Sequence, residues 1–74
     1  MTILKGMAKQ EVEQMADTCA RTRIALIGAG AILTKILKEN PEPELEAKLG
    51  KAMAEIGHAA EALGTASSHL KDAL

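Results

Sequence analysis

The stretch that decides the fold is Lys38-Glu39-Asn40-Pro41-Glu42-Pro43-Glu44, near the middle of the 74-residue chain. Proline has no backbone N–H and is not tolerated inside a helix, so two prolines one residue apart interrupt any helix that reaches them. Asn40 precedes Pro41, where helical backbone angles are disfavoured, and it is a good N-cap residue for a helix that follows. The stretch therefore predicts a turn over residues 39–43 between two helices.

Apolar residues recur on both sides of this turn with alternating steps of four and three residues. Before the turn they are Ala8, Val12, Met15, Cys19, Thr22, Leu26, Ala29, Leu33 and Ile36. After the turn they are Leu45, Leu49, Ala52, Ile56, Ala59, Leu63, Ala66, Leu70 and Ala73. Such steps are typical of helices that pack along a heptad seam. We expect an all-α chain, with helices over about residues 7–38 and 43–73 that form an antiparallel hairpin in one domain, residues 1–74.

A second set of small and apolar residues flanks this expected seam. Gly50, Gly57 and Gly64 recur every seven residues, although a glycine inside a helix costs about 0.8–1.0 kcal/mol relative to alanine. An oligomer interface is expected at Ala20, Ile27, Gly30, Gly50, Met53, Gly57, Ala60 and Gly64. The interpretation is a homo-oligomer, most simply a dimeric four-helix bundle, and the alternative is that the glycines face solvent.

The composition narrows the classes of function. The chain is 47% hydrophobic, has one cysteine and no aromatic residue, and carries a formal net charge of −1 at pH 7. Without aromatic rings there is no stacking platform for bases, and a near-neutral chain has no strong field for phosphate. One cysteine allows no intramolecular disulfide and too few ligands for a zinc knuckle, so neither a metal nor a cofactor is expected.

No group of residues has the arrangement of an active site. Cys19 falls in the expected seam, where a buried small hydrophobic residue is favoured over an exposed nucleophile. The hydroxyls of Thr65, Ser67 and Ser68 lie close to His69 in the sequence, but one helix cannot aim them as a catalytic triad. We therefore expect no enzymatic activity.

The uncharged run from Ile24 to Leu33 raises the question of a membrane. It is too short to cross a bilayer, which takes about 20 residues. Charged residues precede the run and no cleavage-type site follows it, so it does not have the form of a signal peptide. A cytoplasmic location without a membrane span is expected.

An alternative interpretation gives the chain a small anionic ligand. Arg21, Arg23 and His58 would form the site against the small residues, because a guanidinium holds phosphate or carboxylate through two hydrogen bonds. Two simpler interpretations apply to Arg23. Its charge reaches solvent past an apolar surface, or it pairs with a carboxylate such as Glu61 across an oligomer interface.

An alanine- and leucine-rich heptad hairpin resembles the ROP-type RNA-binding hairpin dimers in architecture. That resemblance implies a dimeric bundle, but the mixed charges and the lack of aromatic residues make nucleic acid the least favoured partner. The favoured function is a small non-enzymatic adaptor or inhibitor that associates with itself and with another protein, of a size typical of accessory genes of phages or plasmids. The alternatives are an oligomer that sequesters a small anion or nucleotide and, third, a weak RNA-binding hairpin.

Overall fold

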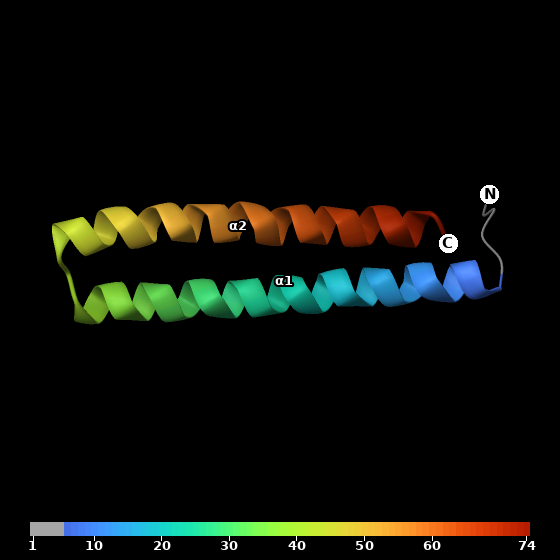
Figure 1. Ribbon diagram of the computed structural model, residues 1–74, viewed down its shortest axis with the longest axis horizontal. Helices are drawn as coiled ribbons and strands as arrows, with labels where there is room; N and C mark the ends of the chain where they lie inside the picture. Colours follow the sequence, from blue (N-terminus) through green and yellow to red (C-terminus); the bar gives the residue numbers. More distant parts are fainter. Residues whose placement is uncertain (1–5) are drawn as a thin grey trace.

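The computed structural model describes residues 6–74, so the first five residues of the expected domain lie outside the described residues. The chain forms two helices, α1 (Met7–Glu39) and α2 (Pro43–Asp72). They lie side by side and antiparallel, with the turn at one end (Figure 1). The hairpin predicted from the sequence is confirmed, and both helices end within one residue of the expected positions.

The turn is held by hydrogen bonds that end α1. The backbone N–H of Asn40 donates to the carbonyl of Ile36 at 2.9 Å, and Asn40 Nδ2 donates to the same carbonyl at 3.1 Å. Asn40 therefore caps the end of α1, and the expectation that it caps the start of α2 is wrong. Glu42 precedes α2, and Pro43 is its first residue, where the missing N–H removes no helical hydrogen bond.

Charged residues at the helix ends follow the helix dipole. Glu44 and Glu46 lie in the first turn of α2, while Lys38 lies in the last turn of α1. Acidic groups are favoured near the positive N-terminal end of a helix, and basic groups are favoured near its negative C-terminal end. Lys48 also forms an exposed ion pair with Glu44 at 3.2 Å, one turn away, which supports the first turns of α2 locally.

The seam between the helices contains one of the two residue rows expected for each helix. The row shared with the prediction is half-buried and consists of Val12, Cys19, Leu26 and Leu33 of α1 with Leu49, Ile56, Leu63 and Leu70 of α2. The second row differs in part. On α1 it includes Ala16 and Gly30, whereas Met15 and Ile36 of the expected row are exposed and Ala29 of that row is half-buried. The seam on α1 is therefore turned by about half a residue position from the expected one.

A similar partial difference occurs on α2. Ala60 and Ser67 are each 7% exposed, whereas Ala59, predicted for the seam, is exposed. The predicted seam residues Leu45, Ala52 and Ala66 are half-buried. The Ser67 hydroxyl donates to the Ala16 carbonyl at 3.1 Å and so joins the two helices directly. A short side chain that reaches the opposite backbone requires the two helices to approach closely. Each helix therefore packs against the other with the row that contains its smaller residues.

This packing leaves the hairpin with almost no core. Among residues 6–74 the only buried hydrophobic residues are Ala16 and Ala60. The molecule measures 54 × 14 × 12 Å, and its radius of gyration is 16.8 Å. A compact domain of this length would have a radius of gyration of about 11 Å. Most of the apolar surface of the chain consequently lies on the outside of a thin rod.

Candidate interaction surfaces on the two flanks of the hairpin

The seam has one further row of residues from each helix on either side. Two antiparallel helices are related by an approximate two-fold axis perpendicular to the plane that contains them. The residues one sequence position before the seam therefore lie on the same side of the hairpin in both helices. We call this side the apolar flank; it consists of Met15, Thr22, Ala29 and Ile36 of α1 and Leu45, Ala52, Ala59, Ala66 and Ala73 of α2. The opposite side, the glycine flank, consists of Glu13, Ala20, Ile27 and Thr34 of α1 and Gly50, Gly57, Gly64 and Lys71 of α2.

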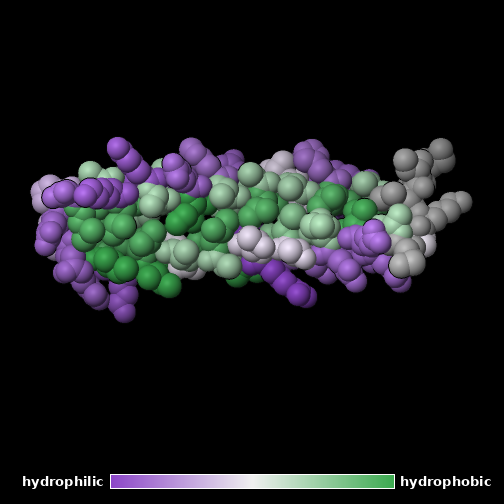
Figure 2. Space-filling model, viewed as in Figure 1, coloured by the Kyte–Doolittle hydropathy of each residue, from purple (hydrophilic) through white to green (hydrophobic). Residues whose placement is uncertain are grey.

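The apolar flank carries no charged residue along its whole length. Met15 is 55% exposed and Ile36 is 36% exposed, and Ile32 at the edge of the flank is 61% exposed. Figure 2 shows apolar residues as a continuous band between two charged edges. Monomeric proteins rarely leave such a contiguous apolar surface open to water, so the band is a candidate interaction surface.

The single hydroxyl in the α1 part of this flank is already paired. Thr22 donates to the carbonyl of Thr18, one turn earlier, at 2.8 Å. The methyl group of Thr22 is then the part of the side chain without a polar partner. Burial of the flank would therefore leave no hydroxyl proton unpaired, which avoids the penalty for a buried unsatisfied donor.

The glycine flank differs in both charge and packing. Its rows contain Glu13 at one end of α1 and Lys71 at the end of α2. A Cβ placed on Gly50 or Gly57 would meet no atom within 4 Å. A Cβ on Gly64 would lie 3.2 Å from both Cδ and Nε of Arg23. Within one hairpin, Gly64 makes room for a side chain, whereas Gly50 and Gly57 have only open space beside them.

Arg23 crosses from the seam onto the glycine flank. Long side chains on a helix lean toward its N-terminus, and Arg23 accordingly reaches back along α1 to the level of Gly64. Its stem packs there, and its guanidinium forms no hydrogen bond or ion pair with any of residues 6–74. Of the interpretations drawn from the sequence, this geometry supports a charge that reaches solvent past an apolar surface.

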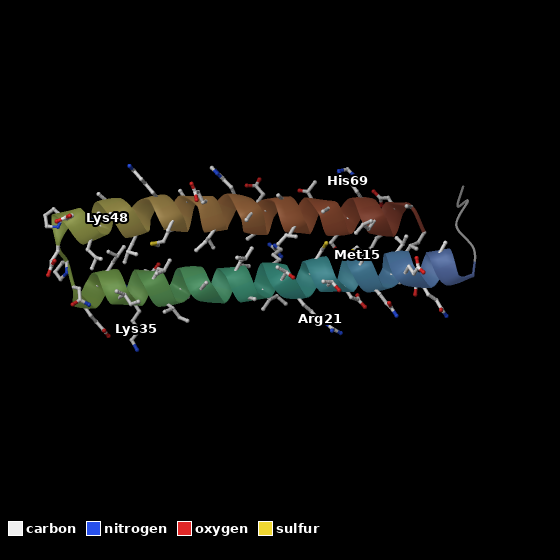
Figure 3. The ribbon with its side chains drawn as sticks, viewed as in Figure 1. Met15, Arg21, Lys35, Lys48 and His69 are labelled. Carbon is white, nitrogen blue, oxygen red and sulfur yellow. The ribbon has the colours of Figure 1, made fainter. Side chains whose placement is uncertain are left out.

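The structure does not bring together the three residues of the expected anion site. Arg21 points away from α2 on the outside of α1 (Figure 3). His58 is exposed and stands two positions before Ala60, which places it about 200° around α2 from the seam. Only Arg23 reaches the space between the helices, so a single hairpin forms no anion site from Arg21, Arg23 and His58.

The eight residues expected at an oligomer interface divide into two groups. Five are buried or half-buried within the single hairpin: Ala20, Gly30, Met53, Ala60 and Gly64. The other three are exposed: Ile27, Gly50 and Gly57. These eight residues do not all lie apart from the seam, because Gly30 and Ala60 lie in the seam itself. Their contact with a second copy stays a prediction.

The residue that the sequence analysis missed is Ser67. It was considered with neighbouring hydroxyls and His69, but it is buried against α1 while His69 points away from α1 (Figure 3). The usable signal was the seven-residue spacing of Met53, Ala60 and Ser67, which places all three on one line along α2. A small polar residue in such a row indicates close helix approach.

The described part of the chain has no other feature of a chemical site. Within residues 6–74, no three His, Cys, Asp or Glu side chains are grouped so that they could hold a metal ion, and no pocket is enclosed. Neither α1 nor α2 has a stretch both long and apolar enough to cross a bilayer. Comparison with protein-family models, with curated proteins and with solved structures finds no match. The flanks are therefore the surfaces from which function is argued.

Proposed function

We propose that this chain is a small non-enzymatic protein that associates with a second copy to form a four-helix bundle, and that the bundle acts as an adaptor or inhibitor of another protein. The observation that carries the proposal is the core of two alanines. Isolated two-helix units gain too little from so small a core, because helical stability in proteins comes mainly from the packing of an apolar face. Association supplies the missing burial.

The exposed area supports the same conclusion. The whole chain of 74 residues exposes 5642 Å². A compact monomer of 7.8 kDa would expose about 4,400 Å², so the excess is about 1,200 Å². A permanent dimer interface buries about 1,000–2,500 Å² on each partner. One interface between two hairpins is therefore enough to account for the excess area.

The adaptor or inhibitor role is supported by what remains outside after association. The rows farthest from the seam carry charges of both signs, among them Arg21, Lys35, Lys51 and Asp72. Figure 3 shows Arg21 and Lys35 directed away from α2. Rigid helices that display mixed charges offer a surface on which a partner protein docks by charge complementarity.

A second candidate function is the binding of a small anion by the assembled oligomer. The observation in its favour is Arg23, whose guanidinium has no partner among residues 6–74. Native mass spectrometry of the purified protein tests this candidate, because it reports stoichiometry and any retained small molecule together. A bundle without bound anion, even with inorganic phosphate added, would exclude it.

Concentration-dependent unfolding tests the proposed self-association. If folding requires a second copy, mass action raises the melting temperature as the protein concentration increases. We expect the helical circular dichroism signal to melt at progressively higher temperature over a wide concentration range. A melting temperature that does not change with concentration would contradict the proposal.

A further inference from the structure

We infer that the second copy packs on the apolar flank, with the two-fold axis parallel to the length of the hairpin, so that both turns lie at the same end of the bundle. This inference rests on the proposed self-association and specifies the surface that performs it. It replaces the glycine-rich interface as the favoured one, because the two flanks differ in charge, polar satisfaction and shape.

Charge distinguishes the flanks first. The apolar flank has nine positions in its two rows, none of them charged, in a chain that is 26% charged. The glycine flank has Glu13 and Lys71 in its rows, and Arg23 lies across its middle. A copy that packed there would take the guanidinium out of water, which is costly without a paired carboxylate. A second copy that packs on the apolar flank buries none of its nine residues as a charged group, because none of them is charged.

The exposed apolar side chains give the second argument. Three of the five exposed large apolar side chains among residues 6–74 lie on or beside the apolar flank, namely Met15, Ile32 and Ile36. The other two belong to the opposite side, with Ile27 on the glycine flank and Ile24 beside it. Met15 and Ile36 also belong to the heptad pattern, although the single hairpin leaves them outside its seam. A second copy on this flank would bury them and account for their place in the pattern.

The shape of the apolar flank favours a second copy of the chain as its partner and indicates how that copy is oriented. The α1 half of the flank contains the larger side chains Met15 and Ile36, whereas most of the α2 half is alanine. A two-fold axis along the hairpin sets α1 of one copy on α2 of the other, so Met15 meets Ala66, while Ile36 and Leu45 pack together beside the turns. An axis across the hairpin would instead set α1 on α1 and alanines on alanines. The flank is thus complementary to itself in the lengthwise arrangement.

Disulfide trapping tests this arrangement in a Cys19→Ala background, which removes the natural thiol. In the lengthwise dimer, Thr22 of one copy lies at the level of Ala59 of the other. A mixture of Thr22→Cys and Ala59→Cys chains is then expected to form the mixed disulfide, which needs Cα atoms about 4.4–6.8 Å apart. Neither variant alone is expected to form a disulfide with itself. The matched pair on the other flank is Ile27→Cys with Gly57→Cys.

Each outcome decides a separate point. Self-linked Thr22→Cys or Ala59→Cys chains would overturn the lengthwise axis. Efficient linking of the Ile27→Cys and Gly57→Cys pair would overturn the choice of flank. Sedimentation of the Cys19→Ala protein, run alongside, shows whether it associates at all. A folded monomer in that experiment would refute the proposed self-association, whereas a dimer that links through the wrong pair refutes only the interface.

Discussion

At the scale of single residues, the glycines of the glycine flank differ in what lies beside them. Gly57 lies inside α2 and has open space where a side chain would be, so the hairpin itself gives no packing reason for glycine there. Gly64 differs because Arg23 lies against it. The two glycines share a seven-residue repeat but have different surroundings, which makes them a matched pair for experiment.

Replacement of Gly57 by alanine is expected to stabilise the protein. The gain in helix propensity is about 0.8–1.0 kcal/mol, and the new methyl group meets no atom within the hairpin. For a chain of this length, a gain of about 1 kcal/mol raises the melting temperature by roughly 4–8 °C. Thermal unfolding measures it, and sedimentation is expected to show unchanged association.

Gly64→Ala is the control, and its gain is expected to be smaller because the Arg23 side chain must move. If Gly57→Ala weakened association instead, the glycine flank would be the interface, contrary to our inference.

Arg23→Lys is expected to leave both stability and association nearly unchanged. Lysine retains a long apolar stem and the charge, and the guanidinium of Arg23 makes no hydrogen bond that would be lost. Chemical denaturation and sedimentation of the variant check this. A marked loss of association would show that the arginine grips a carboxylate or an anion through two hydrogen bonds, which lysine cannot reproduce.

At the scale of the elements, the spacing of α1 and α2 depends on Ser67. Its hydroxyl donates to the backbone carbonyl of Ala16, so the helices approach closely at a layer where both side chains are small. The two prolines predicted the turn, and heptad spacing predicted the helix pair and one row of the seam. The second row was predicted only in part, because Met15 and Ile36 are more apolar than Ala16 and Gly30. Apolarity alone does not distinguish residues buried within one hairpin from residues buried between two.

The same distinction limits what could be predicted for the candidate surfaces. The seven-residue repeat of glycines was visible in the sequence, but it suggested close packing that the single hairpin shows only at Gly64. Arg23 lies on the glycine flank because its side chain leans toward the N-terminus of α1. That lean identifies Gly64 as its neighbour only once the alignment of α1 against α2 is known. Arg21 and His58 are basic residue types like Arg23, yet helix geometry places them on the outside of the hairpin.

Ser67→Ala and Ser67→Leu separate the hydrogen bond from the close approach. In the alanine variant, loss of the hydroxyl donor is expected to lower the free energy of unfolding by about 1 kcal/mol. The cost is no larger because the Ala16 carbonyl remains part of the intact helix α1. Leucine is expected to cost about 1–3 kcal/mol, since it must force the helices apart. Chemical denaturation gives both values. Equal stability of the leucine variant and the natural protein would contradict the close approach of α1 and α2 at this layer.

At the scale of the whole molecule, the apolar flank should behave as an interior surface although five of its nine residues are exposed in one hairpin. Ala59→Glu changes an exposed residue of that flank, so it would be nearly harmless in an isolated hairpin. In the proposed dimer it buries an unpaired carboxylate, which strongly opposes association. We expect the variant to shift to monomer and to lose helical signal at low concentration.

Ala54→Glu provides the matched control, because Ala54 is also an exposed alanine of α2 but lies outside the apolar flank. Its association should remain that of the natural protein. If both variants associated normally, the apolar flank would not be the interface.

Sedimentation equilibrium of the unmodified protein tests the central claim most directly, namely that one hairpin is not a complete folded unit. At concentrations where circular dichroism shows full helix content, the account predicts a mass of about 15.6 kDa, twice the 7.8 kDa of one chain. On dilution, mass and helix content should fall together, because the two-alanine core does not sustain the hairpin alone. A mass of 7.8 kDa with full helix content and cooperative unfolding would contradict it.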